Sequence, residues 1–195
     1  MPKCIECGSY TKYEKGLCYD CYMEKHEGKG NEGMSEKESN YRFNMIKGRI
    51  AETLIQELFL QLGYNVFRYG MENTIPAIMT LLKGVKTEVA SEIKSMPDFV
   101  VQNPRNNEVY FVEVKFRANG TLTRRDIPKE YAWGNAYFIL VSKKHIKCIT
   151  FEELERGEEI TATSKNYLGN RKEFNLDKDT IIEFCDFALT FFEGV

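Results

Sequence analysis

The sequence has no excess of either charge and no long run of apolar residues. Its 195 residues include 27 lysines and arginines against 29 aspartates and glutamates, so the formal net charge is −2. This balance excludes a globally basic nucleic-acid-binding protein, and any nucleic-acid contact must come from a local basic patch. Because the polar N-terminus is not a secretory signal and no apolar run could span a bilayer, we expect a cytoplasmic protein with no membrane contact.

Histidine is also scarce, with two in the chain. His145 follows two lysines at a predicted turn, where a surface position is the better interpretation than a catalytic one. Hydrophobic residues make up 43% of the chain, enough for one full core and a small appendage. Cys148 and Cys185 stand alone in apolar surroundings and are expected to be small buried side chains.

Four of the six cysteines form two closely spaced pairs near the N-terminus. Cys4 and Cys7 are separated by two residues, as are Cys18 and Cys21, and ten residues lie between the pairs. This spacing is typical of a structural zinc site with four thiolate ligands. Two disulfides are the rival interpretation, which the lack of a secretory signal disfavours. We therefore predict a zinc ribbon at residues 1–25, for which the metal supplies the folding energy.

Residues 26–41 contain mostly glycine, glutamate, lysine and serine, and predict a flexible linker. The chain from residue 42 to 195 is then the main domain. It opens with a predicted amphipathic helix over residues 43–62, which ends at Gly63. The apolar side of this helix is predicted to contain Ile46, Ile50, Ala51, Leu54, Ile55, Leu58, Phe59 and Leu62.

Residues 96–117 predict a β-hairpin closed by a turn at residues 104–107. If that turn pairs Asn103 with Glu108, counting outward in the same register places Asp98 opposite Glu113. Two carboxylates so paired would be roughly 5 Å apart, which disfavours folding unless a cation compensates. Divalent cations such as Mg²⁺ prefer these oxygen ligands. Lys115 lies two residues further along, on the same face of the strand as Glu113.

The residues Pro97-Asp98 followed by Glu113-Val114-Lys115 resemble the motif of the PD-(D/E)XK nuclease superfamily. Residues 47–52 and 62–66 resemble the first helix and strand of the same superfamily, most closely in archaeal Holliday-junction resolvases. In those proteins a Gly-x-x-x-Glu helix brings a further carboxylate to the metal site, and Glu52 matches it. The likeness covers residues 41–150. It implies an α/β, restriction-endonuclease-like fold with a mixed sheet flanked by helices, here preceded by the small zinc ribbon.

The resemblance also implies an activity, the metal-dependent hydrolysis of phosphodiester bonds. Asp98 and Glu113 would hold Mg²⁺ or Mn²⁺, with the carbonyl of Val114 as a further ligand and Glu52 completing the metal shell. Lys115 would orient or activate the attacking water and stabilise the charge of the transition state. From the residues alone, an ordinary surface carboxylate is the better interpretation of Glu52, and the resemblance is what favours a site residue.

Basic residues near these elements are candidates for phosphate contacts. They are Arg42, Lys47 and Arg49 near the start of the first helix, and Arg124, Arg125 and Lys129 after the hairpin. The second group lies in residues 123–134, which predict a short helix capped by Asp126 with Pro128 in its first turn. Solvated charges at helix ends are common, so a surface role is the alternative for each.

The other helices, strands and loops of the main domain are predicted from weaker sequence patterns. Residues 70–95 look like an insertion, with a helix over 75–82 and either a strand or a helix over 85–93. Strands are expected at 64–69, 136–142 and 146–149, and Thr150 with Glu153 predicts a capping box that starts a short helix. Residues 155–175 predict a loop. Asp177 or Asp179 would cap a last helix whose apolar side includes Ile181, Phe184, Ala188 and Phe191.

The sequence thus predicts a nuclease with nucleic acid as its partner, with DNA favoured over RNA and an endonuclease favoured over an exonuclease. Resolvases of the similar type act as dimers, so a homodimer is an expectation, although no residues mark a dimer face. Two alternatives remain open at this point. One is a nucleic-acid-binding module that does not cleave, and the other is a zinc-ribbon adaptor that recruits a nucleic-acid machine. The sequence leaves specificity and pathway undetermined.

Overall fold

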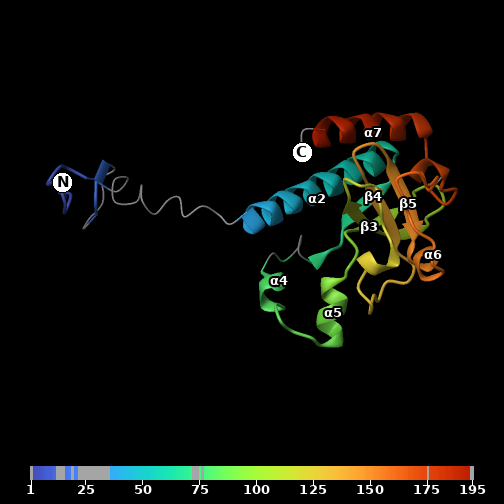
Figure 1. Ribbon diagram of the computed structural model, residues 1–195, viewed down its shortest axis with the longest axis horizontal. Coiled ribbons are helices and arrows are strands. Elements are labelled where there is room, and N and C mark those ends of the chain that lie inside the picture. Colours follow the sequence, from blue (N-terminus) through green and yellow to red (C-terminus); the bar gives the residue numbers. More distant parts are fainter. Residues whose placement is uncertain are drawn as a thin grey trace. The chain divides into compact units, whose positions relative to one another are not determined.

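The computed structural model describes residues 2–11, 16–18, 20–21, 36–71, 75, 77–174 and 176–193. The chain divides into two compact units, Met1–Asn44 and Met45–Val195. Most of the predicted linker lies outside the described residues, but residues 36–41 are helical rather than irregular. They form the start of helix α2, which runs from Glu36 to Gln61 (Figure 1).

Helix α2 therefore begins earlier than the apolar pattern predicts. Its first turns carry helix-forming charged residues, and Arg42 donates to Glu38 one turn earlier at 3.0 Å. The apolar core begins only at Ile50. Ile46 precedes that point and is 53% exposed, so the prediction that it belongs to the buried side is wrong. The glycine at 63 ends this helix in the left-handed conformation, with φ of 82°, as predicted.

The main unit is an α/β structure built on one mixed sheet. Its strands are β1 (Asn65–Arg68), β2 (Phe99–Gln102), β3 (Val109–Phe116), β4 (Tyr137–Val141) and β5 (Ile146–Thr150). They lie in the order β1-β2-β3-β4-β5, and the pairing is antiparallel except between β3 and β4, which are parallel. The prediction of a mixed sheet flanked by helices is confirmed.

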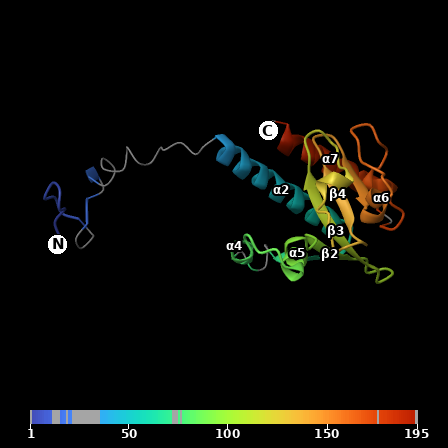
Figure 2. The ribbon, with the colours of Figure 1, turned by 60° about the horizontal axis from the view of Figure 1, so that its bottom comes forward.

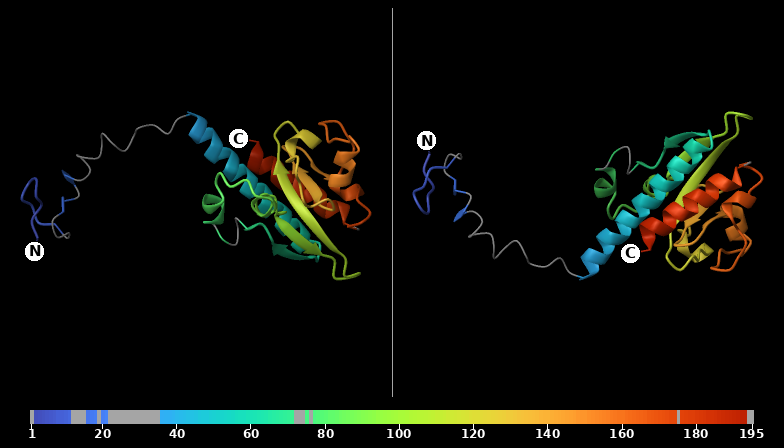
Figure 3. Two further views of the ribbon diagram at one scale, coloured as in Figure 1. Left: turned by 90° about the horizontal axis from the view of Figure 1, so that it is seen from below. Right: turned by 90° about the horizontal axis from the view of Figure 1, so that it is seen from above.

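The two faces of the sheet carry separate apolar clusters. Helix α2 and the last helix, α7 (Lys178–Phe192), lie side by side over one face (Figures 1 and 3). Their apolar side chains share a cluster with alternate residues of the strands, such as Val112 and Ile139. The opposite cluster contains Phe138 and Leu140 and is covered by α6 (Phe151–Glu155) and by loops (Figure 2).

Helix α7 begins and ends as predicted, but its apolar side differs from the predicted one in the last turn. The Asp177 carboxylate accepts the backbone N–H of Thr180 at 2.8 Å, so Asp177 is the N-cap. Ile181, Phe184 and Ala188 are buried as expected. Phe191, however, is 56% exposed and Phe192 is fully buried, which corrects the predicted apolar side by one residue. Phe192 packs against Phe116 of β3, with 4.2 Å between the ring centroids.

Residues 70–95 contain two short helices, α4 (Ile78–Leu81) and α5 (Glu88–Lys94). The segment that could have been a strand or a helix is thus a helix, because the Thr87 side chain caps it by accepting from the N–H of Ala90. Helix α4 buries none of its residues. Elsewhere the predicted capping box of Thr150 and Glu153 is confirmed at the start of α6.

The helix predicted over residues 123–134 is wrong. Only a single 3-10 turn forms, η1 (Arg124–Asp126), and its N-cap is Thr123, while Asp126 is the acidic partner in the capping box. The residue before a proline avoids the helical region, and Ile127 is extended, with φ of −106° and ψ of 141°. Pro128 therefore ends the turn. Residues 155–175 are also less irregular than predicted, because they contain a 3-10 turn, η2 (Leu168–Asn170), and the buried Ile160.

Phe59 is the ring around which the α2 side of the core is packed. It is fully buried and makes edge-on contacts with Tyr64 and Phe174, both with ring centroids 5.4 Å away. We expect Phe59→Ala to lower the free energy of unfolding by about 3–5 kcal/mol, because it leaves a cavity. Urea denaturation measures this loss, with Leu60→Ala, at a position 43% exposed, as the neighbouring control. Equal effects of the two substitutions would contradict this packing.

Candidate active site and cysteine cluster

The hairpin of β2 and β3 has the register that the turn predicts. Gln102 pairs with Val109 and Phe99 pairs with Val112. The N–H of Asn103 donates to the carbonyl of Glu108 at 2.9 Å, which closes the turn. Asn107 takes the left-handed conformation there, with φ of 59°. One step beyond the last pair, this register places Asp98 opposite Glu113.

Asp98 stands at the point where the pairing of β2 with β3 stops. Its carboxylate accepts the backbone N–H of Val114 at 2.7 Å. This carboxylate oxygen takes the place of the backbone carbonyl that β2 would offer if the pairing continued. Asp98 is 7% exposed. A carboxylate this buried must be paired or must have its pKa shifted. Burial first, and then the carboxylates of Glu113 and Glu52, raise the pKa of Asp98 well above its ordinary range.

Glu113 and Lys115 lie on the face of β3 opposite to the α2 and α7 cluster. In the parallel register Glu113 pairs with Phe138, and Lys115 pairs with Leu140. The ammonium group of Lys115 forms an ion pair with the carboxylate of Glu113. The side chain of Glu113 is 13% exposed and that of Lys115 is 29% exposed, so the pair is largely shielded from solvent.

Lys115 keeps its charge in this environment. Burial works to lower the pKa of the ammonium group, but the carboxylates of Glu113 and Asp98 outweigh it and raise the pKa above its ordinary value. Lys115 is therefore a cation at neutral pH. It can donate hydrogen bonds and stabilise negative charge, but it cannot accept a proton.

Glu52 comes to this region from a different element. It lies on α2, half-buried, and its charge contributes to the raised pKa of Asp98. One turn later on the same helix, Gln56 accepts a hydrogen bond from Arg68 of β1 at 3.0 Å. The structure thus groups Glu52, Asp98, Glu113 and Lys115, although they are far apart in the sequence. We refer to these four residues as the carboxylate site.

The donor atoms of the carboxylate site are of the kind that hard divalent cations bind, namely buried carboxylates with like charges close together. Their ligand atoms do not converge here as a tight set of three. In the part of the chain that the structure describes, only four cysteines do so. Glu113 is directed to Lys115 instead. The residues fit a magnesium-type site by their chemistry, and a cation would have to compete with Lys115 for Glu113.

The basic residues predicted to contact phosphates have different roles. Arg124 is a structural residue, because its guanidinium donates to the carbonyls of Ile127, Pro128 and Lys129 and pairs with Glu155. These contacts hold the loop after η1, and the predicted role of Arg124 as a phosphate ligand stays a prediction. Arg42 is paired with Glu38. Arg49, Arg125 and Lys129 have exposed side chains and Lys47 is half-buried, which leaves their predicted role untested.

Aromatic side chains beside the carboxylate site are a feature that sequence reasoning missed. The N–H of Tyr69 donates to the carbonyl of Asp98 at 2.9 Å, so Tyr69 continues β1 opposite Asp98. Phe111 precedes Glu113 by two residues on the same face of β3. The ring of Trp133 contacts both, with centroids 5.6 Å from Tyr69 and 4.9 Å from Phe111. We call Tyr69, Phe111 and Trp133 the aromatic cluster. Its one available signal was Trp133, the single tryptophan of the chain.

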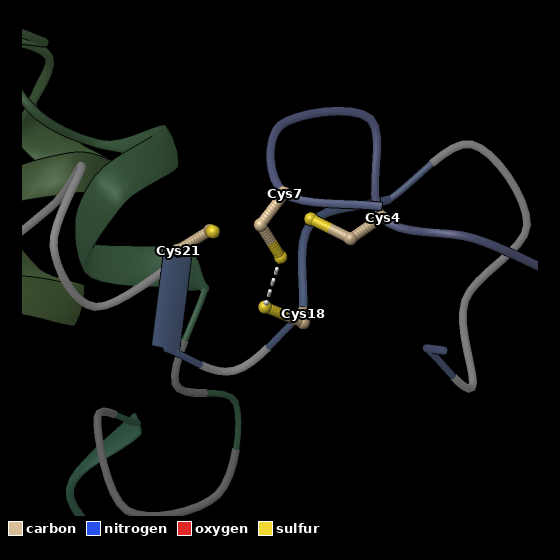
Figure 4. A group of neighbouring side chains, drawn as sticks. All are labelled: Cys4, Cys7, Cys18 and Cys21. Atoms are coloured by element: carbon tan, nitrogen blue, oxygen red, sulfur yellow. Dashed lines mark hydrogen bonds between the residues drawn. The ribbon is translucent and has the colours of Figure 1, made fainter. Parts of the chain in front are cut away.

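The four N-terminal cysteines come together in the other unit. The Sγ atoms of Cys4, Cys7, Cys18 and Cys21 all lie within 4.8 Å of one another (Figure 4). The Sγ atoms of Cys7 and Cys18 are 3.5 Å apart. The cysteines are free thiols rather than disulfides, and a group of four thiolates at these distances could bind zinc.

The backbone of the first knuckle explains how these thiols approach each other. The N–H of Cys4 donates to the carbonyl of Ser9 at 2.7 Å, and the N–H of Gly8 donates to the carbonyl of Cys4 at 3.0 Å. Gly8 has φ of 72°, which a side chain would disfavour. Hydrogen bonds from the backbone at Cys7, and then at Cys18, lower the pKa of the Cys4 thiol to about 6, whereas hydrogen bonds with the side chains of Cys7 and Cys18 raise the pKa of the Cys21 thiol. A lowered pKa favours the thiolate that a metal ion requires.

Comparisons with known proteins find no match. A scan against protein-family models, a search of curated proteins and a search of solved structures each return nothing similar to this chain. Among the described helices none is long and apolar enough to cross a membrane.

Proposed function

We propose that the main unit is a metal-dependent nuclease that hydrolyses phosphodiester bonds, with DNA as the favoured substrate and internal cleavage as the favoured mode. The observation that carries the proposal is the grouping of Asp98, Glu113 and Lys115 on two paired strands, with Glu52 of α2 near enough to affect Asp98. These are the four positions at which the sequence resembles the PD-(D/E)XK nucleases.

The order of the elements supports the same proposal. A helix that contains Glu52 precedes β1, the hairpin β2–β3 follows, and β4 returns parallel to β3. This agrees with the restriction-endonuclease-like arrangement that the resemblance implies. One departure is the segment between β3 and β4, where the superfamily has a helix and this chain has only the 3-10 turn η1.

A divalent cation, Mg²⁺ or Mn²⁺, would be held by the carboxylates of Asp98 and Glu113, with the Val114 carbonyl and Glu52 as further ligands. When bound, such a cation lowers the pKa of a water and polarises a phosphoryl oxygen. In hydrolysis a water oxygen bonds to phosphorus and the bond from phosphorus to the departing sugar oxygen breaks. A carboxylate of the site accepts one proton of the attacking water, and solvent water supplies the proton that the departing sugar oxygen takes up.

Lys115 has a distinct part in this reaction. Because the neighbouring carboxylates keep it protonated, it donates hydrogen bonds to the attacking water or to a phosphate oxygen and stabilises the negative charge that develops there. In the absence of substrate the same ammonium group is held by Glu113. Lys115 is thus already positioned on the face of the strand where the phosphate would be bound.

Replacing Lys115 by methionine tests this assignment. We expect kcat to fall about 10²–10³-fold, the usual effect of losing one stabilising donor in a transition state. The methionine keeps an unbranched side chain, so the fold should persist. Single-turnover cleavage measures the loss, with Lys172→Met as a control at an exposed position to which no role is assigned. Unchanged cleavage by the Lys115 variant would exclude a catalytic role for the ammonium group.

For the N-terminal unit we propose a zinc ribbon with a structural ion held by Cys4, Cys7, Cys18 and Cys21. Four cysteine ligands leave no open position, so this ion would hold the fold together rather than take part in chemistry. Exposed Tyr10 and Lys3 lie on the small hairpin of this unit, where they could contact nucleic acid.

A further inference from the structure

The segment that links η1 to β4 contains two unusual buried donors. Of the buried side-chain nitrogen and oxygen atoms in the described residues, only the hydroxyl of Tyr131 and the Nε1 of Trp133 lack a hydrogen-bond partner. A buried donor without an acceptor is costly and needs an explanation. Both donors belong to one loop and are two residues apart in the sequence, so a ligand bound beside this loop could supply an acceptor to each of them.

Both side chains lie beside the carboxylate site. The ring of Tyr131 contacts Phe138, with centroids 5.4 Å apart, and Phe138 is the strand partner of Glu113. The ring of Trp133 contacts Phe111, two residues before Glu113 on the same face. The phenol of Tyr131 is also within the electrostatic influence of Glu113 and Asp98, which, after burial, raise its pKa. The loop thus borders the acidic residues on the face of the sheet opposite to α2 and α7.

The rings in this place favour one class of ligand. Tyr69, Phe111 and Trp133 are each only half-buried, so part of the aromatic cluster faces solvent next to the site. Aromatic rings stack with nucleobases that are not paired, and the edges of such bases carry carbonyl and ring-nitrogen acceptors. A bound nucleotide could therefore satisfy the two donors and contact the rings at once, which neither a bare phosphate nor an intact duplex could do.

We propose that the aromatic cluster and the donors of Tyr131 and Trp133 bind an unpaired nucleotide next to the bond that is cut. This proposal rests on the proposed function for its substrate, and it narrows that substrate to nucleic acid with single-stranded character. The loop can adjust to the ligand, because after Pro128 it has no regular secondary structure before β4. Arg124 anchors its beginning, and the hydrogen bond from Ala136 to Trp133 at 3.0 Å anchors its end.

The single tryptophan makes the test direct. The full-length protein is titrated in a buffer without Mg²⁺ or Mn²⁺, so that it does not cleave, with a single-stranded DNA oligonucleotide and with a blunt duplex of the same sequence. We expect the single strand to quench the fluorescence of Trp133 and to bind about tenfold more tightly than the duplex. Equal affinity for both, with no change in fluorescence, would overturn the proposal.

Tyr131→Phe separates a binding role from a structural one. It removes the hydroxyl and keeps the ring, so we expect affinity for the single strand to fall about five- to tenfold while the melting temperature stays unchanged or rises. A lower melting temperature with unchanged affinity would overturn the proposal, because the hydroxyl would then act within the fold. Tyr167→Phe, at an exposed tyrosine that lies beside His145, is the control.

The outcomes also separate this proposal from the proposed function. Quenching by the single strand and weaker binding by Tyr131→Phe, in a protein that cuts no substrate, would support the nucleotide site and reject the nuclease. Metal-dependent cleavage with no effect of Tyr131→Phe or Trp133→Phe on affinity, measured by the anisotropy of a labelled oligonucleotide, would reject the nucleotide site and leave the nuclease intact.

Discussion

Replacing Asp98 by asparagine is expected to abolish metal-dependent cleavage, by a factor of about 10³ or more, because it removes a charged ligand from the site. The same change should raise the melting temperature in EDTA. At neutral pH burial, and then the nearby carboxylates of Glu113 and Glu52, disfavour the charged form of Asp98, and this cost destabilises the folded state. Asparagine keeps an oxygen that can accept the N–H of Val114, so the local fold is retained.

The sign of the effect follows from the pKa. A group whose pKa is raised on folding lends stability at low pH, and this stability is lost as the pH rises through the folded-state pKa. The wild-type protein in EDTA should therefore lose stability between the ordinary pKa of aspartate and neutral pH, whereas Asp98→Asn should lose less. Each kcal/mol regained corresponds to about 2–4 °C in a chain of this size.

Added metal should reverse the order of the two melting temperatures, so that the wild-type protein becomes the more stable one. Mg²⁺ or Mn²⁺ binds the folded wild-type site and so raises its melting temperature, but it should have little effect on the variant. Asp186→Asn is the matched control, at an exposed position on α7, which covers the opposite face of the sheet. Cleavage by Asp98→Asn would contradict the metal site. So would a wild-type melting temperature that neither Mg²⁺ nor Mn²⁺ changes.

Removing zinc is expected to unfold the N-terminal unit and to leave the main unit folded. About one zinc ion per chain should be found in the purified protein, and Cys7→Ser should lose it, because three thiolates and a hydroxyl bind zinc far more weakly than four thiolates. Metal analysis measures the stoichiometry, and NMR of the amide region reports which residues lose their structure. The unfolding transition of the main unit, followed by Trp133, should not change.

Cys185→Ser is the control for this substitution. Cys185 lies on α7, outside the cysteine cluster, and is half-buried. It should keep its zinc and its N-terminal structure. A Cys7→Ser protein that retains a full equivalent of zinc would show that the four cysteines are not the ligand set, and so would a purified protein that contains disulfides at these positions.

The hairpin shows why part of the site could be predicted from the sequence. Its turn residues fix the loop length, and a strand pair with a known loop has a known register, so the pairing of Asn103 with Glu108 leads to Asp98 opposite Glu113. The cysteine cluster could be predicted for a similar reason, because each Cys-x-x-Cys knuckle is a local structure made by residues close together in the sequence. The hydrogen bond from Val114 to Asp98 could not be predicted in this way, because it depends on β2 beginning only at Phe99, one residue after Asp98.

The features that sequence reasoning missed depend on distant contacts. The apolar spacing of α2 is regular from Ile46 onwards, but burial depends on how far the sheet extends, so Ile46 is exposed. Residues 123–134 have helical character, yet Pro128 sets the backbone of Ile127 and Arg124 binds the carbonyls that follow. The aromatic cluster unites three segments, and nothing local in any of them indicates that they meet.

The most direct measurement for the central claim is a cleavage panel with the purified full-length protein. Single-stranded, duplex, flapped and four-way-junction DNA, together with RNA, are incubated with Mg²⁺, with Mn²⁺ and with EDTA. We expect cutting of at least one substrate with metal, none in EDTA, and none by Asp98→Asn or by Lys115→Ala. A folded protein that binds these nucleic acids but cuts none with either metal, or one whose cutting survives both substitutions, would contradict the assignment of the carboxylate site as a nuclease centre.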